Sequence, residues 1–204
     1  MQCRKDNDND RIICETETQH KIIIRDICTD DNDRLRLFNC GNESMNAYIH
    51  REALLNHVLG EGITRVVFDE DEENILGYFT LKCTSIIVED PEMDDGKREI
   101  PCVEISRLAV CLSWQNGANG FHLGTSLVGY IIATIKEEIA SRVGCRWITI
   151  HAVKEKVEWY REQFNFDYVI DDTPDEYETV SMFLDISNME AYRTLLSQLN
   201  ESFE

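Results

Sequence analysis

The sequence has little proline, few basic residues and no long apolar run, and each shortage excludes a class of protein. Three prolines and ten glycines among 204 residues argue against a disordered chain, and a hydrophobic content of 43% is enough for a core. No apolar run approaches the roughly 20 residues that span a membrane. The first ten residues, MQCRKDNDND, lack the apolar stretch of a signal peptide. We therefore expect a cytoplasmic protein of one large domain, with or without tails, and no membrane partner.

Basic residues are scarce beside acidic ones, with 20 Lys and Arg against 39 Asp and Glu and a formal net charge of -19. Such a field repels a phosphate backbone, which disfavours non-specific nucleic-acid binding. It suits a cationic partner, such as an amine or a lysine-rich segment. The same charge would also simply keep the protein soluble, and the composition does not separate these two interpretations.

The cysteines and histidines form no recognisable metal motif. None of the eight cysteines lies in a C-x-x-C pair and several lie within apolar runs, so we expect reduced, buried thiols rather than disulfides or a zinc site. Four histidines also lack the spacing of metal ligands, namely His50, His57, His122 and His151. The sequence therefore predicts no bound metal.

The apolar periodicity predicts a single domain over residues 20–186, between a flexible polar segment over 1–19 and a C-terminal helix over 187–204. Predicted strands cover 21–27, 63–68, 75–88, 101–111, 146–153, 166–170 and 180–186. Predicted helices cover 30–38, 42–59, 124–144 and 154–164, and either Asn42 or Ser44 would cap the second of these. This order predicts an α+β fold with a mixed, mostly antiparallel twisted sheet and helices on both faces.

The most informative stretch runs from the buried strand at 104–110 through a loop rich in glycine and asparagine to the helix that follows. Small residues let the backbone come close to a ligand, and a helix N-terminus stabilises negative charge. A strand, a small-residue loop and a helix start in this order are typical of a site for a phosphorylated cofactor.

Four short motifs, in this order and spacing, resemble the Gcn5-related N-acetyltransferase (GNAT) superfamily. They are FNCGN at 38–42, GYFTL at 77–81, RLAV at 107–110 with its glycine loop, and WYREQFNF at 159–166. The first two are similar to motifs of a bacterial branch that includes the tRNA-acetylating toxins. The resemblance implies a GNAT-like fold, acetyl-CoA (coenzyme A) as the cofactor, and direct transfer of an acetyl group to a primary amine.

The resemblance also implies a set of cofactor-binding residues. The pantetheine arm would lie along the backbone of Leu108, Ala109 and Val110. The pyrophosphate would lie against Asn119, Gly120, Leu123, Gly124 and Thr125. The family's R/Q-x-x-G-x-G/A motif fits in two registers, over 115–120 with Ala118 at the first glycine position, or over 119–124 with His122 there. We favour the second register, because LGTSL at 123–127 resembles the family's helix start.

Two residues match catalytic positions of the family. Tyr160 would be the acid that protonates the departing thiolate, although a partly buried aromatic residue would look the same. Glu104 would be the general base, with strand alternation placing it on one face with Ser106 and Leu108. The alternative for Glu104 is an edge carboxylate that pairs with Arg107 or Arg98.

The resemblance leaves the acceptor open. The net charge favours a small amine or a protein amine over aminoacyl-tRNA, the acceptor of the toxin branch, although tRNA is not excluded. The altered glycine loop leaves room for a further alternative, a binding module with the same fold and no catalytic activity. The C-terminal helix would either pack on the core or mediate a homodimer.

Overall fold

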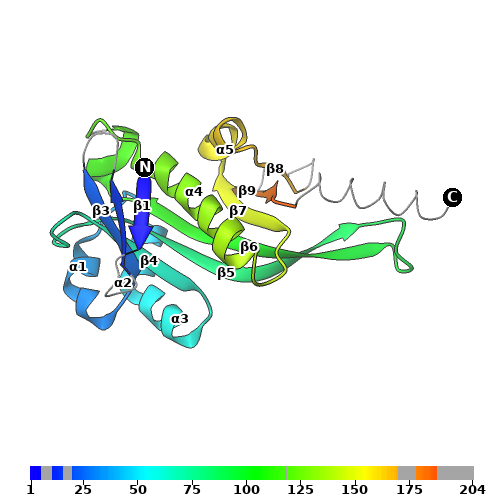
Figure 1. Cartoon of the computed structure of the whole chain (residues 1–204), viewed down its shortest axis with the longest axis horizontal. Helices are drawn as coiled ribbons and strands as arrows, with labels where there is room; N and C mark the ends of the chain where they lie inside the picture. Colours follow the sequence, from blue (N-terminus) through cyan, green and yellow to red (C-terminus); the bar gives the residue numbers. More distant parts are fainter. Residues whose placement is uncertain (6–10, 16–19, 118, 170–177, 188–204) are drawn as a thin grey trace. The chain divides into compact units, whose positions relative to one another are not determined.

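A computed structural model describes residues 1–5, 11–15, 20–117, 119–169 and 178–187 (Figure 1). The chain divides into two compact units. The first unit contains Met1–Thr84 and Val103–Ile135, and the second contains Ser85–Cys102 and the chain from Lys136 onward. Two long strands, β5 (Ile75–Glu89) and β6 (Lys97–Val110), run through both units. None of the described helices is long and apolar enough to cross a membrane.

The first unit is a sheet with helices on both faces, as the sequence predicted. Its strands follow the order β1-β2-β3-β4-β5-β6, and each of the neighbouring pairs from β1 to β5 is antiparallel. Figure 1 shows α1, α2 and α3 on one side of this sheet and α4 on the other. The remaining bounds are β1 Gln2–Lys5, β2 Ile12–Glu15, β3 Lys21–Asp26, β4 Ile63–Phe68, α1 Asn32–Leu37, α2 Glu43–Arg51, α3 Ala53–Leu59 and α4 Leu123–Thr134.

The second unit continues the sheet in the order β5-β6-β7-β9-β8, and β9 pairs with β7 and β8 in antiparallel fashion. Trp147 and Phe183 stack with their ring centroids 4.1 Å apart, beside the buried Ile100 and Cys102. The bounds are β7 Trp147–Val153, α5 Val157–Phe164, β8 Asp167–Tyr168 and β9 Thr179–Asp185. The strand predicted over 166–170 is thus shorter in the structure. The C-terminal helix predicted over 187–204 lies, apart from Ser187, outside the described residues.

The N-terminal region differs from the flexible segment that we expected over residues 1–19. The strands β1 and β2 pair with each other, and Cys3 faces Cys14 across the pair. These two cysteines form a disulfide, so the expectation that all eight cysteines are reduced was wrong. Cys14 is buried and continues the apolar alternation of β2 against β3. That alternation is too short to stand out in a sequence this polar.

The helices are placed by caps and by apolar stripes. Asn42, rather than Ser44, caps α2, because its side-chain oxygen accepts a hydrogen bond from the Met45 amide at 3.1 Å. The helix predicted over 42–59 is interrupted at Glu52 and continues as α3. The four-residue repeat predicted for α4 is confirmed, since three of its apolar residues are fully buried, namely Leu127, Ile131 and Ile135.

The end of α4 differs from the prediction. The α-helix stops at Thr134 and widens into a π-helical turn over Ile135–Ile139, so Gly144 does not cap it. The spacing of apolar residues persists through Ile135 and Ile139 in either kind of helix. Periodicity alone therefore could not reveal the change in winding.

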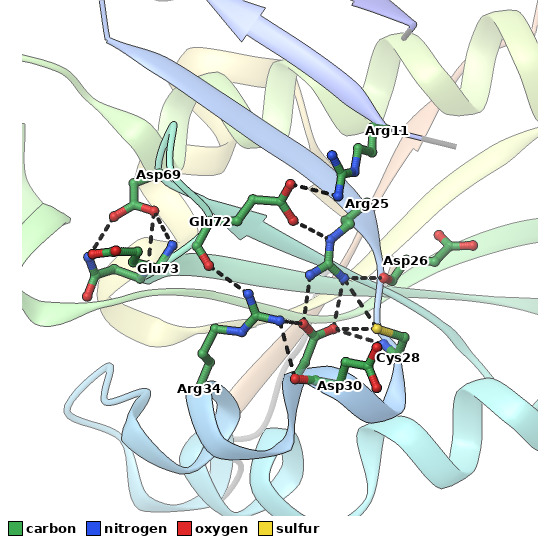
Figure 2. A network of polar contacts seen from close by, with 11 residues as sticks. Arg11, Arg25, Asp26, Cys28, Asp30, Arg34, Asp69, Glu72 and Glu73 are labelled. Atoms are coloured by element: carbon green, nitrogen blue, oxygen red, sulfur yellow. Dashed lines mark hydrogen bonds and ion pairs between the residues drawn. The ribbon is translucent and has the colours of Figure 1, made fainter. Parts of the chain in front are cut away.

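A cluster of charged side chains connects β3 with α1 and with the turn between β4 and β5 (Figure 2). Its members are Arg25, Asp31, Arg34 and Glu72. Asp31 is fully buried, and Arg25 donates to both of its carboxylate oxygens at 2.7 and 2.9 Å. Arg34 donates to the same carboxylate at 2.7 Å, and Glu72 accepts from Arg25 at 2.8 Å. The Arg25 guanidinium lies 4.3 Å from the centroid of the Phe68 ring. Arg25, which contacts both the Asp31 and the Glu72 carboxylates, thus connects the start of α1 with the distant turn between β4 and β5.

Candidate active site

The FNCGN motif at 38–42 forms a turn that is tied to the end of β6. Phe38 is buried in the core, and the Asn39 carbonyl accepts a hydrogen bond from the Leu112 amide at 3.0 Å. The Gln115 side-chain amide donates to the carbonyls of Cys40 and Val110, at 2.9 and 2.8 Å. Two motifs about 70 residues apart in the sequence therefore form one structural unit. Gln115 is turned inward in this unit and is not presented to a ligand as a phosphate-binding residue.

The GYFTL motif lets β5 and β6 come together beneath this turn. A Cβ atom on Gly77 would lie only 2.7 Å from the Ala109 carbonyl oxygen, so a larger residue would push the strands apart. Tyr78 points to the other face and donates to the Met45 carbonyl of α2 at 2.8 Å. The glycine and the tyrosine thus fix the strand that carries Leu108 to Val110, and α2 above it.

The loop after β6 supports the second register of the phosphate motif. A 3-10 segment with a kink occupies Leu112–Gly117, and α4 begins at Leu123. Residues 119–124 therefore lead directly into a helix N-terminus, and residues 115–120 do not. Gly120 adopts a positive φ of 69°, which favours glycine at this position.

The backbone amides of the loop divide into paired and free groups. The Gly120 amide donates to the Gly117 carbonyl at 2.9 Å, and the Leu123 amide donates to the Phe121 carbonyl at 3.1 Å. Within the described part of the chain, the amides of Gly124 and Thr125 have no partner. These two groups in the first turn of α4 can donate to an anion and lie at the positive end of the helix dipole.

Glu104 lies in β6 and is 9% exposed. Its carboxylate pairs with the Lys82 ammonium at 3.2 Å, and the Lys82 side chain is 42% exposed. The alternative partners that we considered, Arg107 and Arg98, are not used, since Arg98 pairs with Asp90 at 3.0 Å. Because β5 and β6 are neighbours, a β5 residue was the natural partner, but the strand register needed to identify it is not visible in the sequence.

Glu104 and Arg107 lie on the same face of the sheet. Tyr48 of α2 stacks on Tyr78 of β5, and the Arg107 guanidinium lies 4.9 Å from the centroid of the Tyr48 ring. Lys82, the partner of Glu104, comes four residues after Tyr78 and points to the same side of β5. Strict alternation would place residues three positions apart on opposite faces, so β6 departs from it between Glu104 and Arg107.

The predicted grouping of Glu104 with Leu108 does not hold. Ala109 packs in the core cluster that contains Tyr78, on the side of the sheet covered by α2. Its neighbour Leu108 therefore faces the other side. A shift of one residue along the strand reverses the direction of every later side chain, and the sequence gives no sign of it.

Tyr160 lies in α5 of the second unit and is 7% exposed. Its ring is held among Trp159, Phe164 and Phe166, with the nearest centroid, that of Trp159, 4.7 Å away. Its hydroxyl has no hydrogen-bond partner among the described residues. Burial raises the pKa of Tyr160 well above its ordinary value. The phenol therefore stays protonated at neutral pH and is available as a proton donor.

The histidines have local structural contacts. His50 Nε2 lies 3.0 Å from the Phe38 carbonyl oxygen, and His57 accepts from the Thr64 amide at 3.1 Å. His151 of β7 is exposed, and its Nδ1 atom lies 3.0 Å from the Ser181 hydroxyl. No group of His, Cys, Asp and Glu side chains suited to a metal gathers within the described ranges.

No family model matches the chain. A tRNA-acetylating toxin of Mycobacterium tuberculosis is 27% identical over 143 residues, which is 67% of this chain and 80% of the relative.

The similar solved structures include several of the toxin AtaT, of which two bear on the reaction. AtaT complexed with acetyl-methionyl-tRNAfMet has a TM-score of 0.65 and 21% identity, over 84% of this chain and 98% of that one. An AtaT mutant with tyrosine changed to phenylalanine, bound to acetyl-CoA and the C-terminus of the antitoxin AtaR, has a TM-score of 0.62. It is 23% identical over 85% of this chain and 98% of that one. The chain therefore has the fold of the GNAT superfamily, and the branch that it resembles is that of the tRNA-acetylating toxins.

Proposed function

We propose that the protein is an acetyl-CoA-dependent N-acetyltransferase whose acceptor is the amino group of an aminoacyl-tRNA. The observation that carries this proposal is the set of free amides of Gly124 and Thr125 at the start of α4, directly after the RLAV strand and its glycine loop. This arrangement suits a pyrophosphate. It occurs in a fold shared with a toxin whose structure contains acetyl-CoA.

The proposed cofactor contacts follow from these elements. Gly124 and Thr125 would donate to the pyrophosphate, with Asn119, Gly120 and Leu123 shaping the loop around it. The pantetheine arm would lie along Leu108, Ala109 and Val110, as a further strand does. Bound acetyl-CoA supplies a thioester that an amine can attack.

The transfer needs one proton acceptor and one proton donor. Glu104 would take a proton from the acceptor ammonium, which frees the nitrogen lone pair to attack the thioester carbonyl carbon. As the C–N bond forms and the C–S bond breaks, Tyr160 would protonate the sulfur and regain a proton from the nitrogen. The products are the acetylated amine and free coenzyme A.

The comparisons favour the acceptor that the net charge ranked second. The charge of -19 favoured a small or protein amine. However, the curated relative is a tRNA-acetylating toxin, and one similar structure holds acetyl-methionyl-tRNAfMet. Net charge describes the average field of the whole chain, whereas an acceptor is held by the few side chains that it contacts. Such an acceptor would also place the reaction in the cytoplasm, where charged tRNA occurs.

An acceptor assay tests the proposal. Purified protein, radiolabelled acetyl-CoA and a set of charged tRNAs at low salt should yield acetylated aminoacyl-tRNA, whereas a panel of polyamines and lysine-rich peptides should remain unlabelled. Labelling of the amines alone would exclude tRNA as the acceptor. Binding of acetyl-CoA in calorimetry without turnover on any acceptor would favour the binding module suggested by Ala118 and His122 in the loop.

Replacing Gly124 by alanine should separate cofactor binding from folding. A Cβ atom there would have its nearest neighbour, a methyl carbon of Val110, at 3.8 Å, so the fold should accept it. In the complex, the methyl group added by Gly124→Ala would stand between the α4 amides and the pyrophosphate. Calorimetry should show a Kd for acetyl-CoA that is at least about tenfold higher, which corresponds to about 1.4 kcal/mol.

Gly129→Ala is the matched control for Gly124→Ala. It lies in the same helix, and nothing in the structure lies within 4 Å of the added methyl group. Its Kd for acetyl-CoA should equal that of the wild type. Neither variant should melt below the wild type, because alanine favours a helix more than glycine does. Equal affinity in the two variants would remove the α4 N-terminus from the cofactor site.

A further inference from the structure

Arg107 is a partly buried cation for which the described part of the chain provides no anion. Its Nη1 group donates to the Ser106 carbonyl at 2.7 Å, and its guanidinium lies 4.9 Å from the centroid of the Tyr48 ring. The Nε atom is shielded from water and has no hydrogen-bond partner among the described residues. None of the described carboxylates forms an ion pair with Arg107. A shielded donor that lacks a partner is unfavourable, so the site favours a ligand that supplies an acceptor.

The other partly buried arginines of the first unit are satisfied. Arg25 and Arg34 share the Asp31 carboxylate, and Arg65 pairs with Asp26 at 3.1 Å. Among the partly buried arginines of the described chain, Arg107 alone forms no ion pair with a carboxylate, although the sequence has 39 acidic residues. The Nη2 group of Arg107 has no partner among the described residues and is not shielded from water. A stacked, planar guanidinium with such a group is suited to a phosphate or a carboxylate from outside the chain.

The position of Arg107 relates it to the acceptor rather than to the cofactor loop. Arg107 and Glu104 lie on the face of the sheet that α2 covers, and Glu104 is the proposed base. The pyrophosphate is proposed to bind at the loop and at the start of α4. The helix α4 covers the other face of the sheet, where Gly77 of β5 faces Leu127. An anion held by Arg107 would therefore belong to the molecule whose amine Glu104 deprotonates.

We propose that Arg107, stacked on Tyr48, binds a phosphate at the 3′ end of the acceptor RNA and thereby selects aminoacyl-tRNA over smaller amines. This inference rests on the proposed function. In an aminoacyl-tRNA the amino acid carboxylate is an ester, so the nearest anions are the phosphates of the terminal nucleotides. A polyamine has no anion to offer, and a free amino acid would offer its carboxylate instead.

The first test compares two acceptors and three variants. Arg107→Gln should lower kcat/KM for aminoacyl-tRNA by about tenfold to hundredfold, as expected for the loss of a charged hydrogen bond. It should leave the rate on an amino acid ethyl ester, which has no phosphate, at the wild-type value. Arg107→Lys, which keeps the charge without the planar fork, should recover part of the loss. Arg51→Gln, at an exposed residue of α2, should have no effect.

A binding measurement keeps the inference testable if turnover is absent. A fluorescent RNA with the sequence of a tRNA 3′ end should bind the wild type, and Arg107→Gln should flatten the slope of log K against log salt by about one. An unchanged slope, or an equal loss of rate on the tRNA and the ethyl ester, would overturn the role of Arg107. If Arg107→Gln flattened the slope but the wild type acetylated no acceptor, the result would count only against the proposed reaction.

Discussion

Replacing Tyr160 by phenylalanine should lower kcat by about a hundredfold. This is near the lower end of the range for loss of a general acid, because a thiolate is already a fair leaving group. The affinity for acetyl-CoA should not change. The melting temperature should stay close to that of the wild type, since the ring remains among Trp159, Phe164 and Phe166 and the lost hydroxyl has no partner in the described protein. Steady-state kinetics and calorimetry on the same preparation would measure all three quantities.

Tyr168→Phe is the matched control for Tyr160→Phe. Tyr168 also lies in the second unit, and its hydroxyl is 3.5 Å from a carboxylate oxygen of Glu158. Its kcat should equal that of the wild type. If Tyr160→Phe also retained full kcat, Tyr160 would have no part in the mechanism, and its burial would be a matter of packing alone.

The pKa of Tyr160 adds a second readout. Burial raises this pKa above its ordinary value of 10.0, because the charged phenolate is poorly solvated. The folded state therefore holds a proton that the unfolded state releases, so the contribution of Tyr160 to stability is complete below pH 10 and is lost as the pH rises toward the folded pKa. Above pH 10, denaturation midpoints should fall more steeply for the wild type than for Tyr160→Phe.

Replacing Asp31 by asparagine should destabilise the first unit by about 3–5 kcal/mol, as expected when one partner of a buried ion pair is removed. The change leaves Arg25 and Arg34 facing each other without the fully buried carboxylate that both contact (Figure 2). Urea denaturation followed by circular dichroism would measure the loss. Asp30→Asn, at the exposed neighbour, should cost less than about 0.5 kcal/mol, as is usual for surface substitutions.

The loss of unfolding free energy at low pH should also be smaller in Asp31→Asn than in the wild type. Burial opposes the charged form of Asp31, but hydrogen bonds from Arg25 and from the Cys28 amide outweigh it and lower its pKa below 3.8. Because the folded pKa is depressed, the stabilisation is present above pH 3.8 and is lost as the pH falls through the folded value. The wild type should lose stability in this range, and Asp31→Asn should lose less. If the unfolding free energy fell equally with pH in both proteins, Asp31 would not be the group responsible for the pH dependence.

Prediction from the sequence succeeded where a signal is local. The strands β4 and β5 formed where expected, and Leu127 and Ile131 of the predicted repeat lie buried in α4. Each of these signals depends on residues near each other in the sequence. The motif order was sufficient to predict the fold, and the solved structures confirm it. The strands β1 and β2 were missed because their apolar residues are few and lie between polar runs.

The candidate site was less accessible to prediction, because its contacts join distant parts of the chain. The pairing of Lys82 with Glu104 depends on the register of two strands, and the stacking of Arg107 on Tyr48 depends on an irregularity within one strand. Neither leaves a mark on composition or spacing. Gln115 is a further example, since it begins the motif only in the register that we did not favour, and the structure turns its side chain toward two carbonyls.

By itself, the sequence determined most of the secondary structure, the fold class and the residues in which cofactor chemistry is to be sought, because these follow from periodicity and from motifs a few residues long. Only the tertiary structure decided which amides of the loop remain free and which charges lack a partner. The physical reason is that a hydrogen bond or ion pair exists only once both groups have been brought together. Whether the polar groups of Gly124, Glu104 and Arg107 are paired therefore depends on which other segments of the chain lie beside them.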